Sequence, residues 1–351
     1  MKLNPASSSA MLDRVSVYLR RGDEDLALAD LNQLIGLHPD NSDARVSRGA
    51  ILARRGRADD AIADYSVALR RKPDDAQGWL GRAFAETSKG DRTAAEPDVR
   101  QAIRLEPDSA QAHQLLASLL QARGDTAGAA AEFDHATRLD PDNPQPFNLR
   151  GDAALAAGDR DGAIAQYSRA LALDPRLVSA LNNRGVAYLA RSEPGPAQAD
   201  FTAALELNPD NVSALVNRGL ARQAEGNRDG AIADFSAAIR IEPGAVQALR
   251  HRAFLEQDKR DFAAARADYA RAVALDAEDE EAQRGRGLAE LSLKNYDAAI
   301  ADLTTAVSLD PKDARAYLFR AEAYAGKNEN KLAVADLDAA HRIGGGDAKG
   351  Q

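Results

Sequence analysis

Apolar residues recur along the chain with the spacing of an α-helix. In residues 61–65 (AIADY) and 231–235 (AIADF), apolar side chains fall at i, i+1 and i+4, which share one helical face. Two such stripes alternate through the sequence, and short turns such as Lys89-Gly90-Asp91 separate them. Glycine in the turn closes the first helix, and aspartate caps the second. No period-2 alternation indicates a strand, so the pattern predicts an all-α fold.

The helical pattern repeats every 34 residues without an insertion. An alanine marks the middle of each period, at Ala27, Ala61, Ala95, Ala129, Ala163, Ala197, Ala231, Ala265, Ala299 and Ala333. A proline follows the second helix in eight periods, at Pro39, Pro73, Pro107, Pro141, Pro175, Pro209, Pro243 and Pro311. A fixed period of this length predicts an array of helix pairs, each of which packs on its neighbours.

A 34-residue helix–turn–helix unit with a small residue early, alanine midway, an aromatic residue four positions later and proline near the end resembles the tetratricopeptide repeat family. Leu31, Val99, Leu303 and Leu337 replace the aromatic residue but remain apolar. The resemblance covers residues 8–344 and implies a right-handed superhelical solenoid of antiparallel helix pairs. The ten repeats start at residues 8, 42, 76, 110, 144, 178, 212, 246, 280 and 314, leaving an N-terminal tail (1–7) and a polar tail (345–351).

Nine repeats carry arginine at the seventh position, where the family usually has leucine. An acidic residue follows sixteen positions later in nine repeats. The exceptions are Leu116 at the arginine position and Gln166 at the acidic position. Because this arginine faces the second helix, we expect partly buried ion pairs in which the planar guanidinium engages both carboxylate oxygens. An anion-binding track along the groove is the alternative. The expected structural pairs are Arg48–Asp64, Arg82–Asp98, Arg184–Asp200, Arg218–Asp234, Arg252–Asp268, Arg286–Asp302 and Arg320–Asp336.

The resemblance also marks a partner-binding groove, because the first helices line the concave face in this family. The expected groove residues are Leu80, Phe84, Asn182, Asn183, Val186, Leu189, Val216, Asn217, Leu220, Arg250, His251, Phe254, Arg284 and Leu288. An apolar strip flanked by hydrogen-bond donors suits an extended peptide or an amphipathic helix. The alternative is that the apolar residues pack between neighbouring first helices. The lysine and asparagine that clamp chaperone C-termini in one subclass occur together in no repeat.

Composition narrows the chemistry. The net charge of −9 argues against sequence-independent nucleic-acid binding, and the lack of cysteine excludes thiolate catalysis and Cys-based zinc sites. The histidines, His38, His113, His135, His251 and His341, occupy different unit positions, so neither a metal nor a cofactor is predicted. No apolar run approaches 18 residues, which predicts no membrane insertion. The start of the sequence lacks an intact signal peptide, so we expect a cytoplasmic protein, or a periplasmic or secreted one if a signal peptide was removed.

The repeats account for nearly the whole chain and leave no room for a catalytic domain. No phosphate-binding loop or nucleophile elbow occurs, so the sequence predicts no enzyme. We expect a protein-interaction scaffold or adaptor that binds a protein or peptide partner. A chaperone-like holder of unfolded or exported chains and a regulatory subunit of a separate enzyme are the alternatives.

Two local features carry further expectations. Pro97 lies just inside a second helix, so this helix should start late or bend. The last helix, from Asn330 to about Ile343, carries apolar residues that would normally face a following repeat. We therefore expect weak self-association through this helix, or raised mobility in residues 328–343.

Overall fold

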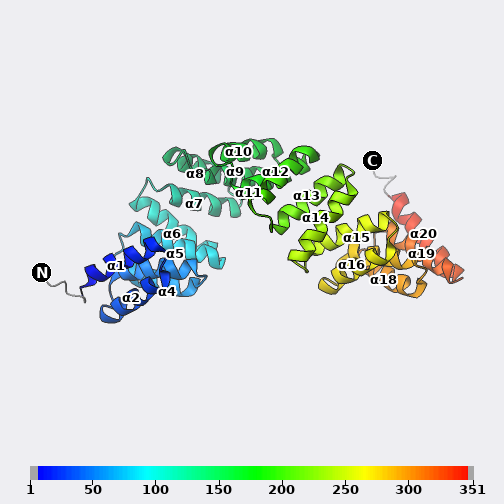
Figure 1. Ribbon diagram of the computed structural model, residues 1–351, viewed down its shortest axis with the longest axis horizontal. Coiled ribbons are helices and arrows are strands. Elements are labelled where there is room, and N and C mark those ends of the chain that lie inside the picture. The colour runs from blue at the N-terminus through cyan, green and yellow to red at the C-terminus, as the bar shows by residue number, and fades with distance from the viewer. Residues whose placement is uncertain (1–6, 347–351) are drawn as a thin grey trace. The chain divides into compact units, whose positions relative to one another are not determined.

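The computed structural model describes residues 7–346, which form twenty helices joined by short turns, with no strand among them (Figure 1). The predicted all-α fold is confirmed. The helices are α1 (Ser8–Arg21), α2 (Glu24–Leu37), α3 (Ser42–Arg54), α4 (Ala58–Arg71), α5 (Ala76–Lys89), α6 (Arg92–Leu105), α7 (Ala110–Ala122), α8 (Thr126–Leu139), α9 (Gln145–Ala156), α10 (Arg160–Leu173), α11 (Val178–Ala190), α12 (Pro194–Leu207), α13 (Val212–Ala224), α14 (Arg228–Ile241), α15 (Val246–Asp258), α16 (Phe262–Leu275), α17 (Glu280–Ser292), α18 (Tyr296–Leu309), α19 (Ala314–Gly326) and α20 (Asn330–Gly346).

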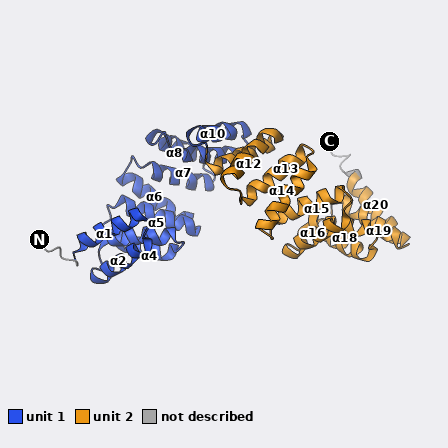
Figure 2. Ribbon diagram, viewed as in Figure 1, with its two compact units in different colours: residues 1–175 blue, residues 176–351 orange. Residues whose placement is uncertain are grey.

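The chain divides into two compact units, which we call unit 1 (residues 1–175, with α1–α10) and unit 2 (residues 176–351, with α11–α20) (Figure 2). Within each unit, odd-numbered and even-numbered helices pair, and each even-numbered helix also packs on the next odd-numbered one. Odd-numbered helices of neighbouring pairs contact each other as well, as α15 does with α17. The first helices of the repeats therefore lie side by side within each unit.

The residue that connects the two helices of a repeat has a left-handed backbone conformation in all ten repeats. Six of these residues are glycines, Gly22, Gly56, Gly90, Gly124, Gly158 and Gly226, which adopt a positive φ without steric cost. Ser192, Arg260, Lys294 and Asn328 take the same conformation with φ between 61° and 64°. Asparagine tolerates this region, but at Ser192, Arg260 and Lys294 the packing of the two helices imposes a backbone conformation that the residue itself does not favour.

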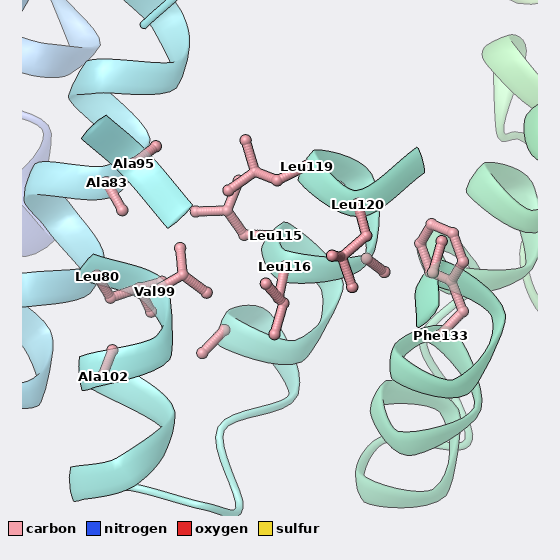
Figure 3. Close-up of a cluster of buried hydrophobic side chains, with 13 residues drawn as sticks. Leu80, Ala83, Ala95, Val99, Ala102, Leu115, Leu116, Leu119, Leu120 and Phe133 are labelled. Carbon is pink, nitrogen blue, oxygen red and sulfur yellow. The ribbon is translucent and has the colours of Figure 1, made fainter. Parts of the chain in front are cut away.

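Small and large side chains alternate in the core. The alanine midway through each repeat is buried, which lets the second helix approach the first closely. Figure 3 shows this core in unit 1, where Leu115 and Leu119 of α7 face Ala83 and Ala95, and Phe133 of α8 lies on the other side. The residue four positions after the alanine, such as Phe133, is also buried in nine repeats, and the exception is Leu337 of the tenth.

The arginines at the seventh position of the repeat contact the aspartates sixteen residues later, between the two helices of the repeat. In the seven expected pairs, both guanidinium-to-carboxylate hydrogen bonds are present, with lengths between 2.5 and 3.0 Å. Arg150, which has Gln166 sixteen residues later, hydrogen-bonds Asp134 of the preceding repeat instead. Because aspartates occupy these guanidinium forks, the geometry favours interhelical pairing over an anion-binding track.

The expectation that the Pro97 helix starts late is wrong. Helix α6 begins at Arg92, in the same repeat register as the other second helices. The Asp91 side chain caps it by accepting a hydrogen bond from the Ala94 amide at 3.0 Å. Pro97 lies on the exposed face of the helix, so water can satisfy the carbonyl that lacks a donor.

Candidate functional site

Four first helices of unit 2, α13, α15, α17 and α19, line a pocket of about 480 Å³, which we call the unit 2 pocket. Residues one repeat apart meet there because their helices lie side by side in register. The pocket brings together five of the expected groove residues, Arg250, His251, Phe254, Arg284 and Leu288.

The apolar wall of the unit 2 pocket comes from three successive repeats. Phe254 on α15, Leu288 on α17 and Phe319 on α19 contribute it. Phe254 is 48% exposed although it stands among apolar neighbours. An aromatic side chain that is half exposed inside a concavity has apolar area available for a partner.

Two arginines at the pocket are oriented by acids at the starts of first helices, either the next one or their own. The Arg250 Nη1 atom lies 2.7 Å from Glu281 Oε2 and 3.2 Å from Asp279 Oδ1. In the next repeat, Arg284 pairs with Asp313 and, at 2.7 Å, with Glu280. These pairs hold the guanidinium groups in place before any partner arrives, which lowers the entropic cost of binding.

Three buried polar atoms at the unit 2 pocket have no hydrogen-bond partner among residues 7–346: Gln223 Oε1, Arg250 Nε and Gln257 Nε2. Two of them are donors and one is an acceptor. Buried polar groups are normally satisfied, because an unpaired one costs about 1–3 kcal/mol. A ligand that supplies both an acceptor and a donor would satisfy them.

His251 adds a neutral polar group to the same wall. Burial, with a smaller contribution from the positive charge of Arg250, lowers the pKa of His251 below its usual value. Its ring stacks on Phe235, with the ring centroids 5.6 Å apart. The imidazole is therefore fixed in position and uncharged at neutral pH, when it can both donate and accept a hydrogen bond.

Other expected groove residues lie elsewhere. Leu80 and Val216 are only 3% and 6% exposed, so expecting them on the groove surface was wrong. Val186 and Leu189 pack on the core cluster around Phe201. Leu80 and Val216 are thus buried by neighbouring side chains, whereas Val186 and Leu189 are half-buried.

The polar members of the α11–α13 region interact with one another. The Asn217 amide donates to Asn182 Oδ1 at 3.4 Å, and Asn183 and Leu220 are half-buried. In unit 1, Phe84 remains exposed and lines a cavity of about 310 Å³ with Gln114 and Ser118 of α7. Unit 1 thus offers a smaller counterpart to the unit 2 pocket.

Four of the residues of the unit 2 pocket that the sequence-based selection missed lie on its first helices at regular repeat positions: Gln223, Gln257, Arg315 and Phe319. Arg315 and Phe319 occupy the second and sixth positions of the tenth repeat, and both glutamines occupy the twelfth position of theirs. These are groove positions in the family, so applying the same rule to every repeat would have found all four.

Family sequence models match the chain over most of its length. A model described as a tetratricopeptide repeat matches residues 12–76, 190–246 and 252–306, which is more than half of the chain. A second tetratricopeptide repeat model matches residues 87–153. A model described as a TPR repeat matches residues 151–191 and 287–328. No curated protein matches the sequence.

Solved structures resemble the chain at low sequence identity. PilF of Pseudomonas aeruginosa is 20% identical with a TM-score of 0.54, covering 59% of this chain and 95% of that one. A tetratricopeptide repeat protein from Parabacteroides merdae is 21% identical with a TM-score of 0.51, covering 74% and 98%. Cut9, solved with Hcn1, is 16% identical with a TM-score of 0.52, covering 96% and 73%. At these identities the likeness shows the fold alone. None of the described helices is long and apolar enough to cross a membrane.

Proposed function

Because the chain belongs to the tetratricopeptide repeat family, we propose that it is a non-catalytic scaffold that binds an extended peptide segment of a partner protein in the unit 2 pocket. The observation that carries the proposal is the combination of an exposed Phe254 with three unsatisfied buried polar atoms in one concavity. Apolar area supplies affinity, and the polar atoms fix the orientation of the bound segment.

An extended peptide fits this pocket better than an amphipathic helix does. A helix has already used its backbone N–H and C=O groups internally, whereas an extended segment presents both to the protein. Once these buried side-chain atoms turn toward the pocket, the backbone carbonyl of the segment accepts from Arg250 Nε or Gln257 Nε2, and its amide donates to Gln223 Oε1. An apolar side chain of the segment packs between Phe254 and Leu288.

The polar lining favours a selective adaptor over a holder of unfolded chains. A holder needs a broad apolar surface without directional groups, whereas this pocket places oriented arginines and glutamines beside its apolar wall. Directional hydrogen bonds reject segments that leave buried polar atoms unpaired. We therefore expect a small set of partners that share one short sequence pattern.

The test is affinity capture from the organism's own lysate with quantitative mass spectrometry. Phe254→Ala removes the exposed aromatic surface, and Leu275→Ala is the matched control, because Leu275 is 54% exposed but lies at the end of α16, outside the pocket. We expect wild type and Leu275→Ala to capture the same few proteins and Phe254→Ala to lose most of them.

Each alternative gives a different result in this experiment. A holder would capture many unrelated unfolded proteins, and an added denatured competitor protein would displace them. Stoichiometric recovery of a single enzyme whose activity changes on binding indicates a regulatory subunit. Partner capture that Phe254→Ala leaves unchanged contradicts binding in the unit 2 pocket.

We further infer weak self-association through α20. Leu337 is 48% exposed, whereas Leu303, the equivalent residue of the preceding repeat, is 0% exposed. Val334, on the same helix, is also exposed. Sedimentation velocity across a concentration series tests this, with Leu337→Asp as the variant. Loss of concentration dependence in the variant supports the inference, and a wild type that stays monomeric throughout contradicts it.

A further inference from the structure

The fourth repeat replaces both members of the arginine–aspartate pair. Leu116 stands in the arginine position, and Glu132 stands in the aspartate position. His113, three residues before Leu116, takes over the contact, with its Nδ1 atom 2.6 Å from Glu132 Oε2. Leu116 is buried in the apolar cluster shown in Figure 3. The polar contact between α7 and α8 is therefore moved by about one turn and made from a different pair of groups.

A second histidine completes a cluster. His135 lies three residues after Glu132 on α8, so the two side chains share one helical face. The His135 ring stacks on that of His113, with centroids 4.8 Å apart and planes inclined by 15°. One ligand atom from each of His113, Glu132 and His135 lies within 4.8 Å of the others.

The tautomer of His113 suits metal coordination. Its Nε2 atom lies 2.9 Å from the Pro107 carbonyl oxygen, which only accepts hydrogen bonds, so Nε2 carries a proton. The Nδ1 atom therefore points at Glu132 and is the ring nitrogen available to an ion that enters between the two groups. Metal-binding histidines commonly donate their other ring N–H to a backbone carbonyl in this way, which fixes the ring and its tautomer.

We propose that His113, Glu132 and His135 form a binding site for a divalent transition-metal ion, with Zn²⁺ as the best-suited candidate. Two imidazole nitrogens and one carboxylate form a ligand set that Zn²⁺ uses, with a fourth position left for water or a partner's side chain. Mg²⁺ and Ca²⁺ prefer oxygen ligands only, and Cu⁺ prefers sulfur, so this set disfavours both classes.

Small side-chain movements adapt the cluster to an ion. Tetrahedral zinc with bonds of about 2.0–2.2 Å separates its ligand atoms by roughly 3.4 Å. The contact between His113 and Glu132 must open slightly, and the stacked His135 ring must turn to direct a nitrogen at the ion. His135 is exposed and Glu132 is only half-buried, whereas His113 is buried and held by Pro107. The side chains of His135 and Glu132 can therefore move toward the ion, while His113 stays in place.

A bound ion replaces a direct contact between two of its ligands. In the metal-free protein, His113 Nδ1 lies 2.6 Å from Glu132 Oε2. The ion takes a lone pair from each of these groups and separates them. The bound ion then joins α7 to α8, whereas the arginine–aspartate pair joins the two helices in eight other repeats.

The test is isothermal titration of the tag-free full chain with zinc chloride. We expect one ion per chain. His135→Ala should weaken binding at least about tenfold, since loss of a zinc ligand costs more than loss of its outer-shell partner. Glu132→Gln gives a second, nearly isosteric variant that keeps the volume of the side chain.

His38→Ala is the matched control, because His38 is also exposed but lies far from the cluster in sequence, at the end of α2. It should bind like the wild type. No stoichiometric zinc binding overturns the proposal. Equal binding by wild type, His135→Ala and Glu132→Gln overturns it as well, and indicates that the cluster is only an interhelical hydrogen-bonded stack.

Discussion

The close approach of α9 and α10 makes a quantitative prediction about Gly151. A Cβ atom built on Gly151 would lie 2.4 Å from Tyr167 Cε1 and 2.5 Å from Cδ1. Carbon atoms pack favourably at about 3.5–4.0 Å, so one of the two must move by about 1 Å. The Tyr167 ring is fully buried, and its hydroxyl donates to Asp152 Oδ1 at 2.8 Å. Packing and this hydrogen bond both hold the ring in place.

The magnitude follows from two opposing effects of Gly151→Ala. Overpacking a filled core costs about 1–3 kcal/mol, and alanine regains about 1 kcal/mol of helix propensity over glycine. Gly36→Ala, in α2 of the same unit, isolates the second effect because no atom lies within 4 Å of its Cβ. We expect Gly36→Ala to stabilise unit 1 slightly and Gly151→Ala to destabilise it, with a difference of about 1–3 kcal/mol.

The assay is urea unfolding followed by circular dichroism, including the double variant Gly151→Ala/Tyr167→Phe. Removing the hydroxyl frees the ring to shift, as in the fourth repeat, where Ala117 and Phe133 are both buried without such a hydrogen bond. The double variant should therefore be more stable than the sum of the single effects predicts, by about 1 kcal/mol. A Gly151→Ala protein as stable as Gly36→Ala, or strictly additive effects, refutes the reasoning.

Three further outcomes are expected. Burial, with help from a neighbouring aspartate, raises the pKa of Glu86 to about 7. The stability of the protein should therefore fall as the pH rises from about 4.5 to 7, and thermal melts of Glu86→Gln should not show this decrease. Arg260→Gly should raise the melting temperature by relieving about 1 kcal/mol of left-handed strain, and an unchanged value argues against strain. Asp234→Ala should cost about 3–5 kcal/mol in denaturant titrations, because it leaves Arg218 and Arg222 without their shared carboxylate.

The sequence alone determined the architecture, because the information is local and repeated. The 34-residue period, the buried alanines and the turn residues specify each helix pair within a short stretch of chain. The ion pairs followed for the same reason, since residues sixteen apart across one tight turn have few ways to meet. Pro97 shows the limit of this reasoning, because its penalty depends on whether it faces solvent or a neighbour.

The tertiary structure decided which residues of the first helices are accessible. Leu80 and Phe84 lie on the same helix and both occupy expected groove positions, yet one is buried and the other exposed. Their fate depends on contacts with helices of adjacent repeats, which a unit-by-unit reading of one sequence does not specify. The unit 2 pocket likewise requires residues from four repeats, and Arg250 and Phe319 are 69 residues apart in the chain.

The histidine cluster and the strained turns have the same origin. His113, Glu132 and His135 occupy three different unit positions, so the repeat pattern hides their proximity until α7 and α8 are packed together. Arg260 carries no preference for a positive φ, but a two-helix turn of fixed length requires one there. In both cases packing between helices determines the conformation. The sequence pattern mainly predicts interactions within each helix.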